Sequence, residues 1–318
     1  MSILTHPGIA AFLQTQATPP LPDAPLAVFD CDGTIIRGDI GEAMFYHQIE
    51  HFLFKRSPAA VWPDHPRRDD LDSMYHRLRL LAPAARHSSA DAVAFADILL
   101  SWYADQIAAG AVAKACADIV RLLAGYSLAE VRAIAEETFL AEASSPLGER
   151  TLGTNTLPKG IRYLRESVDL LLELQRRGFD IWALSGSNKW SVEPVFRRLG
   201  VPDDHVVGLE LKTHDNILST DAVEPIPVRD GKIPALRRFT AKVPVLVASD
   251  SRNDIPLFLS SANVKVRINS RHRDTDDFFR AAGTGPDDSW VVLEDPHTIE
   301  TGEWPTFLSR PRKGFHCP

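Results

Sequence analysis

The chain has 318 residues, of which 44% are hydrophobic and 24% charged, close to the average of globular proteins. Its 42 acidic side chains outnumber its 35 basic ones, and no run rich in lysine and arginine occurs, so we expect no nucleic-acid partner. The three cysteines, Cys31, Cys116 and Cys317, are far apart, which excludes a disulfide framework and argues against a zinc–thiolate site. A chain of this length can bury a large core without such staples.

Residues 1–25 are interpreted as an N-terminal extension, because they lack the basic start and the long apolar stretch of a signal peptide. No window approaches 18 uncharged apolar residues, so we expect no membrane span. The low cysteine content fits a reducing compartment, and a cytoplasmic location is therefore expected. The sequence does not indicate the oligomeric state.

The first strand is predicted at 26–30, a continuous apolar run that ends in an acid and is typical of a buried parallel strand. Helical periodicity then dominates as far as 145, as in 91–106 and 112–123. Ser127 and Glu130 have the spacing of a capping box at the start of another helix. This region is therefore predicted to be a bundle of helices.

From residue 158 onward, strand and helix patterns alternate. Helices are predicted at 161–177, 188–199, 233–239 and 254–260, and strands at 179–184, 205–211, 243–248, 264–268 and 289–293. Such alternation indicates an α/β fold with a parallel sheet covered on both faces, and the first strand must belong to it because a lone buried strand leaves its backbone groups unpaired. We therefore predict an α/β core over 26–37 and 148–295, an inserted all-helical domain over 38–147, and an irregular tail over 296–318.

Three predicted strands are followed by polar, reactive side chains. Asp30 and Asp32 end the first strand, Ser185 follows a second, and Asp250 and Asp254 follow a third. Ligands of open parallel sheets bind beyond the carboxyl ends of the strands, so we expect these side chains to converge. Up to four carboxylates would then lie together, and a hard divalent cation such as Mg²⁺ would relieve their repulsion. The alternative for each pair of acids is an ordinary turn.

The smaller residues around these ends have candidate roles too. Gly33 permits the turn that leaves the first strand, and the hydroxyl of Ser185 with the amides of Gly186 and Ser187 could bind anionic oxygens. A plain N-cap serine is the alternative for Ser185. Lys232, at the start of a helix, could neutralise a phosphate, although such a lysine is usually solvated.

Together, these segments resemble the four motifs of the haloacid dehalogenase-like superfamily of phosphatases that use an aspartate nucleophile. Asp30-Cys-Asp-Gly-Thr34 resembles the first motif, Ser185 the second, Lys232 the third, and Asp250 with Asp254 the fourth. The resemblance implies a Rossmann-like core and a helical cap domain, inserted directly after the first motif as in the phosphoserine phosphatase-like branch.

The resemblance also implies the chemistry. Asp30 would attack phosphorus to form an aspartyl-phosphate, Asp32 would act as general acid and then as general base, and Ser185 and Lys232 would hold the phosphoryl oxygens. The Mg²⁺ ligands would be Asp30, the carbonyl oxygen of Asp32 and Asp250, and Asp254 would orient Lys232 or a metal-bound water. The expected partner is a small-molecule phosphate monoester.

Substrate recognition would lie in the cap. Asp39 and Glu42 follow Asp30 at spacings where phosphoserine and phosphorylcholine phosphatases, respectively, carry an acid that faces a cationic group, so an amino- or ammonium-bearing substrate is expected, with Asn253 near the phosphate. Gly33 departs from both relatives, which have Ser or Asn there. A phosphotransferase on the same scaffold and a non-catalytic phosphate-binding module remain as alternatives.

Overall fold

The computed structural model of the protein describes residues 3–15, 24–269, 275–285 and 287–304. Its centre is a six-stranded sheet in the order β12-β11-β10-β1-β6-β7, in which every neighbouring pair is parallel. The strands are β1 (Leu26–Phe29), β6 (Asp180–Asn188), β7 (Val206–Leu209), β10 (Pro244–Ser249), β11 (Val264–Asn269) and β12 (Trp290–Glu294). The predicted α/β core is confirmed, and β1 lies between β10 and β6.

Helices cover both faces of this sheet. Successive side chains along β1 point to opposite faces, so each face needs its own cover. Ala27 and Phe29 belong to one buried cluster with α1, α9 and α10, whereas Leu26 and Val28 belong to another with α11, α12 and α13. These helices are α1 (Pro7–Thr15), α9 (Arg165–Arg176), α10 (Lys189–Arg197), α11 (Lys232–Arg237), α12 (Ile255–Leu259) and α13 (Thr275–Ala282). The sheet is therefore the middle layer of three.

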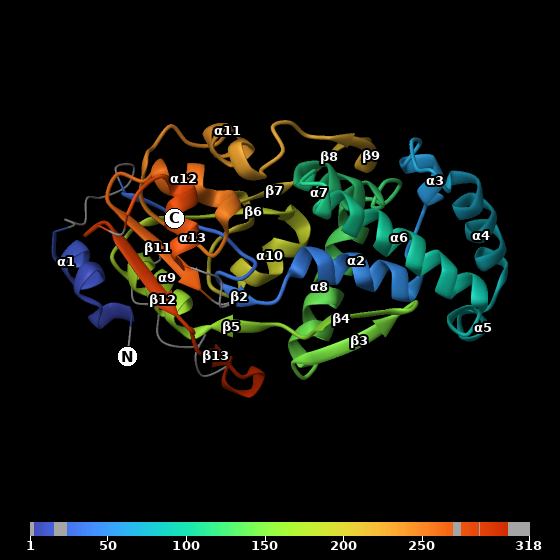
Figure 1. The fold of residues 1–318 in the computed structure, drawn as a ribbon, viewed down its shortest axis with the longest axis horizontal. Coiled ribbons are helices and arrows are strands. Elements are labelled where there is room, and N and C mark those ends of the chain that lie inside the picture. The colour runs from blue at the N-terminus through green and yellow to red at the C-terminus, as the bar shows by residue number, and fades with distance from the viewer. Residues whose placement is uncertain (1–2, 16–23, 270–274, 286, 305–318) are drawn as a thin grey trace.

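All regular structure between residues 38 and 147, here called the helical segment, is helical (Figure 1). It comprises α2 (Ile40–His51), α3 (Pro58–Val61), α4 (Arg68–Leu80), α5 (Pro83–His87), α6 (Ala90–Ala108), α7 (Val112–Arg121) and α8 (Leu128–Ser144). Most of its buried hydrophobic residues form one cluster together with Trp190, Leu209, Leu211 and Leu218, and the capping box of Ser127 and Glu130 is present at the start of α8. No helix of the described residues is long and apolar enough to cross a bilayer.

Several short elements differ from the prediction. The helix expected to begin at 161 is preceded by β5 (Arg162–Leu164), which pairs with β2 (Ile36–Arg37) and β13 (Thr298–Ile299). The tail predicted to be irregular thus contains a short strand, because Ile299 and Trp304 are buried against the core; residues 305–318 lie outside the described part. Two hairpins were not predicted, namely β3 (Gly148–Leu152) with β4 (Asn155–Lys159) and β8 (Leu211–His214) with β9 (Ile217–Ala222).

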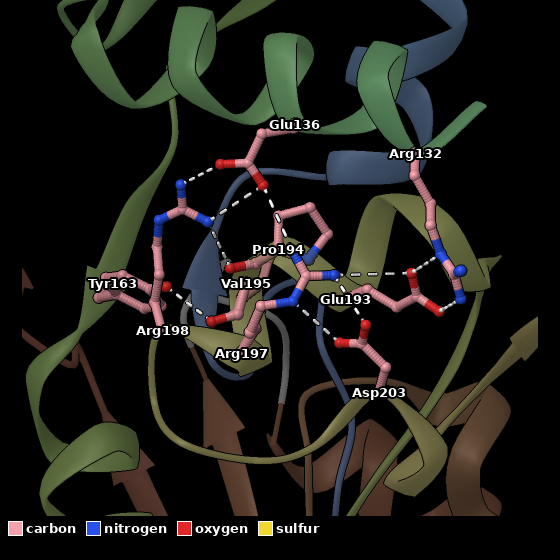
Figure 2. Close-up of polar contacts among 9 residues, drawn as sticks. All are labelled: Arg132, Glu136, Tyr163, Glu193, Pro194, Val195, Arg197, Arg198 and Asp203. Atoms are coloured by element: carbon pink, nitrogen blue, oxygen red, sulfur yellow. Dashed lines mark hydrogen bonds and ion pairs between the residues drawn. The ribbon is translucent and has the colours of Figure 1, made fainter. Parts of the chain in front are cut away.

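Ion pairs join the helical segment to the α/β core where α8 packs on α10 (Figure 2). Arg132 on α8 lies 3.0 Å from the carboxylate of Glu193, which is fully buried on α10. Glu136 on α8 pairs with Arg198, and Arg197 lies 3.6 Å from the same carboxylate. Burial raises the pKa of Glu193 above its ordinary value, and the neighbouring Arg132 offsets only part of that rise.

Backbone hydrogen bonds make a second connection. The β8–β9 hairpin follows β7 in the chain, and the amide of Gly125 donates to the carbonyl of Leu218 at 2.8 Å. The amide of Leu218 donates in turn to Tyr126, and that of Leu128 donates to Asn216. The turn between α7 and α8 is therefore paired with this hairpin much as one strand is with another.

Candidate active site

The ends of β6, β1 and β10 meet at one edge of the sheet. The amide of Asp30, directly after β1, donates to the carbonyl of Ala248 on β10 at 2.9 Å. Asp250 follows β10 and Ser185 lies near the end of β6, on the other side of β1. The first and fourth motifs are neighbours, as the sequence predicts for them.

Lys232, the first residue of α11, lies between two carboxylates. Its Nζ is 2.9 Å from Oδ1 of Asp30 and 2.7 Å from Oδ2 of Asp254, and all three side chains are buried. Burial alone would lower the pKa of Lys232, but the carboxylates of Asp254 and Asp30 outweigh it and raise the pKa. The lysine is thus a buried, charged group and not a solvated one.

Asp30 is surrounded by more negative than positive charge. Burial raises its pKa to about 8; Lys232 opposes this, while Asp254, Asp250 and Asp32 add to it. The side chain of Asp250 lies against Gly33, where an added Cβ would come within 2.3 Å of Oδ2 of Asp250. Because Gly33 also has a φ of +75°, no other residue fits this turn without strain.

These donors suit a hard divalent cation. The buried carboxylates of Asp30 and Asp254 contact Lys232, the buried carboxylate of Asp250 acts on Asp30, and oxygens are the ligands that Mg²⁺ prefers. Within the described ranges, no group of three or more His, Cys, Asp or Glu side chains is arranged to hold a metal ion. Mg²⁺ keeps several waters and takes few carboxylates, so a site with fewer than three such side chains still fits this ion. Asp254, engaged by Lys232 and by the hydroxyl of Ser249 at 2.5 Å, lies where it can orient the lysine.

The carboxylate of Asp32 is oriented by two strong donors. The amide of Ile40, the first residue of α2, donates to Oδ1 at 2.7 Å, and the hydroxyl of Ser187 donates to Oδ2 at 2.6 Å. The hydroxyl of Ser185 lies farther from Oδ2, at 3.4 Å, and accepts from the amide of Ser187. Asp32 thus connects the end of β6 with the start of the helical segment. The sequence predicts that Ser187 binds the phosphate, and nothing in the spacing of these residues indicated its contact with Asp32.

A small, partly open pocket of about 40 Å³ lies beside Ser187 and Asp39. Its lining combines the first turns of α2 with apolar residues of the helical segment and the last residues of β6: Asp39, Gly41, Glu42, Met44, Phe45, Gln48, Tyr103, Cys116, Ile119, Val120, Leu123, Gly186, Ser187 and Asn188. Predicted substrate residues Asp39, Glu42, Gly186 and Ser187 are thus brought together.

Tyrosine hydroxyls hold the carboxylate of Glu42 in this pocket. Tyr46 donates to one oxygen at 3.1 Å and Tyr103 to the other at 3.0 Å. Burial, with the nearby charge of Glu42, raises the pKa of both tyrosines, so their hydroxyls stay protonated and donate. Asp39 has a different task, since its Oδ1 caps α2 by accepting from the amide of Glu42. Nothing in the spacing of the sequence indicated that Tyr46 and Tyr103 would contact Glu42.

Asn253 is not among the residues that line the pocket. Its Oδ1 accepts from Nε of Arg229 at 3.0 Å, and Nη1 of Arg229 donates to the carbonyl of Gly110 at the turn between α6 and α7. Asn253 therefore lies at a contact between the sheet domain and the helical segment. Arg229 carried no sequence signal of this role.

A family model described as haloacid dehalogenase-like hydrolase matches residues 72–259, more than half of the chain. Among curated proteins, phosphoserine phosphatase SerB2 of Mycobacterium tuberculosis is 35% identical over 103 residues. That alignment covers 31% of this chain and only 24% of the relative, so the chain matches about a quarter of the relative's length. The predicted resemblance to the phosphoserine phosphatase-like branch is confirmed.

One of the similar solved structures shares the fold at low identity. A conserved protein of unknown function from Anaerococcus prevotii is 18% identical with a TM-score of 0.66, covering 83% of this chain and 84% of that one. A protein of unknown function from Bordetella pertussis is also 18% identical, with a TM-score of 0.48 and coverage of 85% and 97%. The similarity to the Anaerococcus prevotii protein covers both the sheet and the helical segment.

Proposed function

The chain belongs to the haloacid dehalogenase-like hydrolase family, and on this premise we propose that it is a Mg²⁺-dependent phosphatase of small-molecule phosphate monoesters. The observation that carries the proposal is the buried contact of Lys232 with both Asp30 and Asp254 beside Asp32 and Asp250. Enclosed groups of this kind, with strongly perturbed pKa values, are typical of catalytic sites. An ordinary turn or a solvated lysine would not be buried in this way.

In the proposed reaction, Asp30 attacks phosphorus and forms an aspartyl-phosphate as the ester bond breaks. Lys232, 2.9 Å from Asp30, would neutralise the equatorial oxygens on which charge develops, with help from Ser185. Asp32 would give its proton to the leaving alcohol and then take one from the water that releases phosphate. Bound Mg²⁺ would supply positive charge to the same oxygens, held by Asp30, Asp250 and the carbonyl of Asp32.

Magnesium should stabilise the protein, and more so at alkaline pH. Because the pKa of Asp30 is raised to about 8, the folded state binds more protons than the unfolded state between its two pKa values, and stability without metal falls as pH rises through that window. We expect Mg²⁺ to raise the unfolding temperature more at about pH 8.5 than at about pH 6, and EDTA to abolish turnover of 4-nitrophenyl phosphate. Asp250→Asn should lose most of the stabilisation. An equal shift in that variant would contradict the assigned ligands.

We further propose that the substrate carries an amino or ammonium group. Glu42 offers a negative charge inside a largely apolar pocket, and two tyrosine hydroxyls fix its direction. A cation in such a site is attracted by the carboxylate and by the faces of aromatic rings. The similarity to a phosphoserine phosphatase, whose substrate has an amino group, supports the same class.

Glu42→Gln is expected to raise KM for phosphoserine or phosphocholine by about 10- to 100-fold, the effect of losing a charged hydrogen-bond partner. KM for an uncharged alkyl phosphate should change little, because that ester has no cation to recognise. Glu137→Gln, at a side chain that is 69% exposed on α8, is the matched control. An equal rise in KM for charged and uncharged esters would argue against an ammonium site.

A further inference from the structure

We propose that the hydroxyl of Ser187 is a positioning group for the general acid Asp32, and that it does not serve as a ligand of the phosphoryl group. The inference rests on the proposed function, since Asp32 transfers a proton only if the protein hydrolyses phosphate esters. Its basis is the 2.6 Å hydrogen bond between the Ser187 hydroxyl and Oδ2 of Asp32.

The two oxygens of Asp32 have partners of different kinds. Oδ1 accepts from the backbone amide of Ile40, a group that can only donate. Oδ2 faces a hydroxyl, which can donate to a carboxylate and can also accept from a carboxylic acid. The proton of the acid form therefore resides on Oδ2. This is also the oxygen nearer to Ser185, at 3.4 Å, where the phosphoryl group is expected.

Close packing fixes the hydroxyl in this place. A Cβ on Gly41, in the first turn of α2, would lie 2.3 Å from Oγ of Ser187 and 2.7 Å from its Cβ. The amide of Ser187 donates to the hydroxyl of Ser185 at 3.1 Å. Ser187 is thus confined between the end of β6 and the start of α2, and only glycine at position 41 leaves room for it.

This arrangement accounts for both proton transfers. As the ester P–O bond breaks, the proton on Oδ2 passes to the departing oxygen, and the hydroxyl of Ser187 turns from acceptor to donor. When water attacks the aspartyl-phosphate, its proton returns to Oδ2, the bond from phosphorus to Asp30 breaks, and the hydroxyl turns back. The cycle leaves Ser187 and Asp32 unchanged.

Two matched esters test the inference. 4-Nitrobenzyl phosphate needs a proton on its leaving alkoxide, whereas 4-nitrophenyl phosphate releases a stable phenolate. We expect Ser187→Ala to lower kcat/KM by about 30-fold for the benzyl ester and by about threefold at most for the phenyl ester, within the range of general acid catalysis. Because kcat/KM reports steps up to the release of the alcohol, later hydrolysis does not blur the comparison.

Two further variants separate positioning from binding. Gly41→Ala keeps the Ser187 hydroxyl but displaces it, and should reproduce the selective loss. In an Asp32→Asn background, Ser187→Ala should have no further effect, since the proton it positions is gone. Equal losses on both esters, together with weaker inhibition by inorganic phosphate, would make Ser187 a phosphate ligand and overturn the inference alone. A wild-type protein that hydrolyses neither ester in Mg²⁺ would overturn the proposed function and the inference with it.

Discussion

Replacing Asp30 by asparagine is expected to reduce turnover of 4-nitrophenyl phosphate by about 10³-fold or more, the scale of loss when an enzyme loses its nucleophile. The amide has nearly the same shape as the carboxylate and can still accept from Lys232, so the fold should persist. Its oxygen is too weak a nucleophile to form the covalent intermediate. Steady-state kinetics in Mg²⁺, with circular dichroism to verify folding, measure the effect.

Asp72→Asn is the matched control, because its side chain is 49% exposed on α4 and lies outside the site. Beryllium fluoride, which mimics a phosphoryl group on aspartate, should raise the unfolding temperature of wild type and of the control but not of Asp30→Asn. Retention of more than about a tenth of wild-type turnover would show that Asp30 is not the nucleophile. An inactive wild type that still binds phosphate would favour the non-catalytic module.

The largest loss of stability is expected from Lys232→Met. Removing one partner of a buried ion pair leaves an uncompensated charge and costs about 3–5 kcal/mol. Lys232 is the buried cation for both Asp30 and Asp254, so the variant leaves two buried carboxylates without this cation. Denaturant unfolding at neutral pH measures the change, and turnover should fall with it because the phosphoryl oxygens lose a cation.

The sign of the pH dependence checks the cause. The pKa of Lys232 is raised in the folded state, so its contribution is present in full below the unfolded pKa and is lost as pH rises through the folded one. The cost of Lys232→Met should therefore be present in full at neutral pH and shrink only in strong alkali, and adding Asp254→Asn should restore part of the stability. The exposed Lys212→Met is the control. No rescue by the second substitution would mean that packing, and not charge, dominates.

The sheet was predictable because its strands are buried on both faces. β1, β6 and β10 are continuous apolar runs that end in polar side chains, and this pattern also fixed which loops would meet. The β3–β4 and β8–β9 hairpins carry polar residues on partly exposed strands and lack that signal. β5 is only three residues long, and the prediction included it in the helix that follows it.

Within the site, the residue types and their strand-end positions could be predicted, but their hydrogen-bond partners could not. The contact of Lys232 with Asp254 follows from the motifs, whereas that of Ser187 with Asp32 depends on how closely the start of α2 approaches the end of β6. The contact between Arg229 and Asn253 likewise joins elements that are brought together only by packing. Such distances are a property of the tertiary structure and leave no periodic trace in the chain.

The pairing of the β8–β9 hairpin with the turn between α7 and α8 limits how the helical segment can move. Leu211 and Leu218 of the hairpin are buried in one hydrophobic cluster with this segment, so an outward swing would either break the backbone hydrogen bonds at Gly125, Leu218 and Leu128 or carry the hairpin along. It would also break the ion pairs between α8 and α10. Amide hydrogen exchange is therefore expected to be slow along the hairpin and its partner turn throughout turnover.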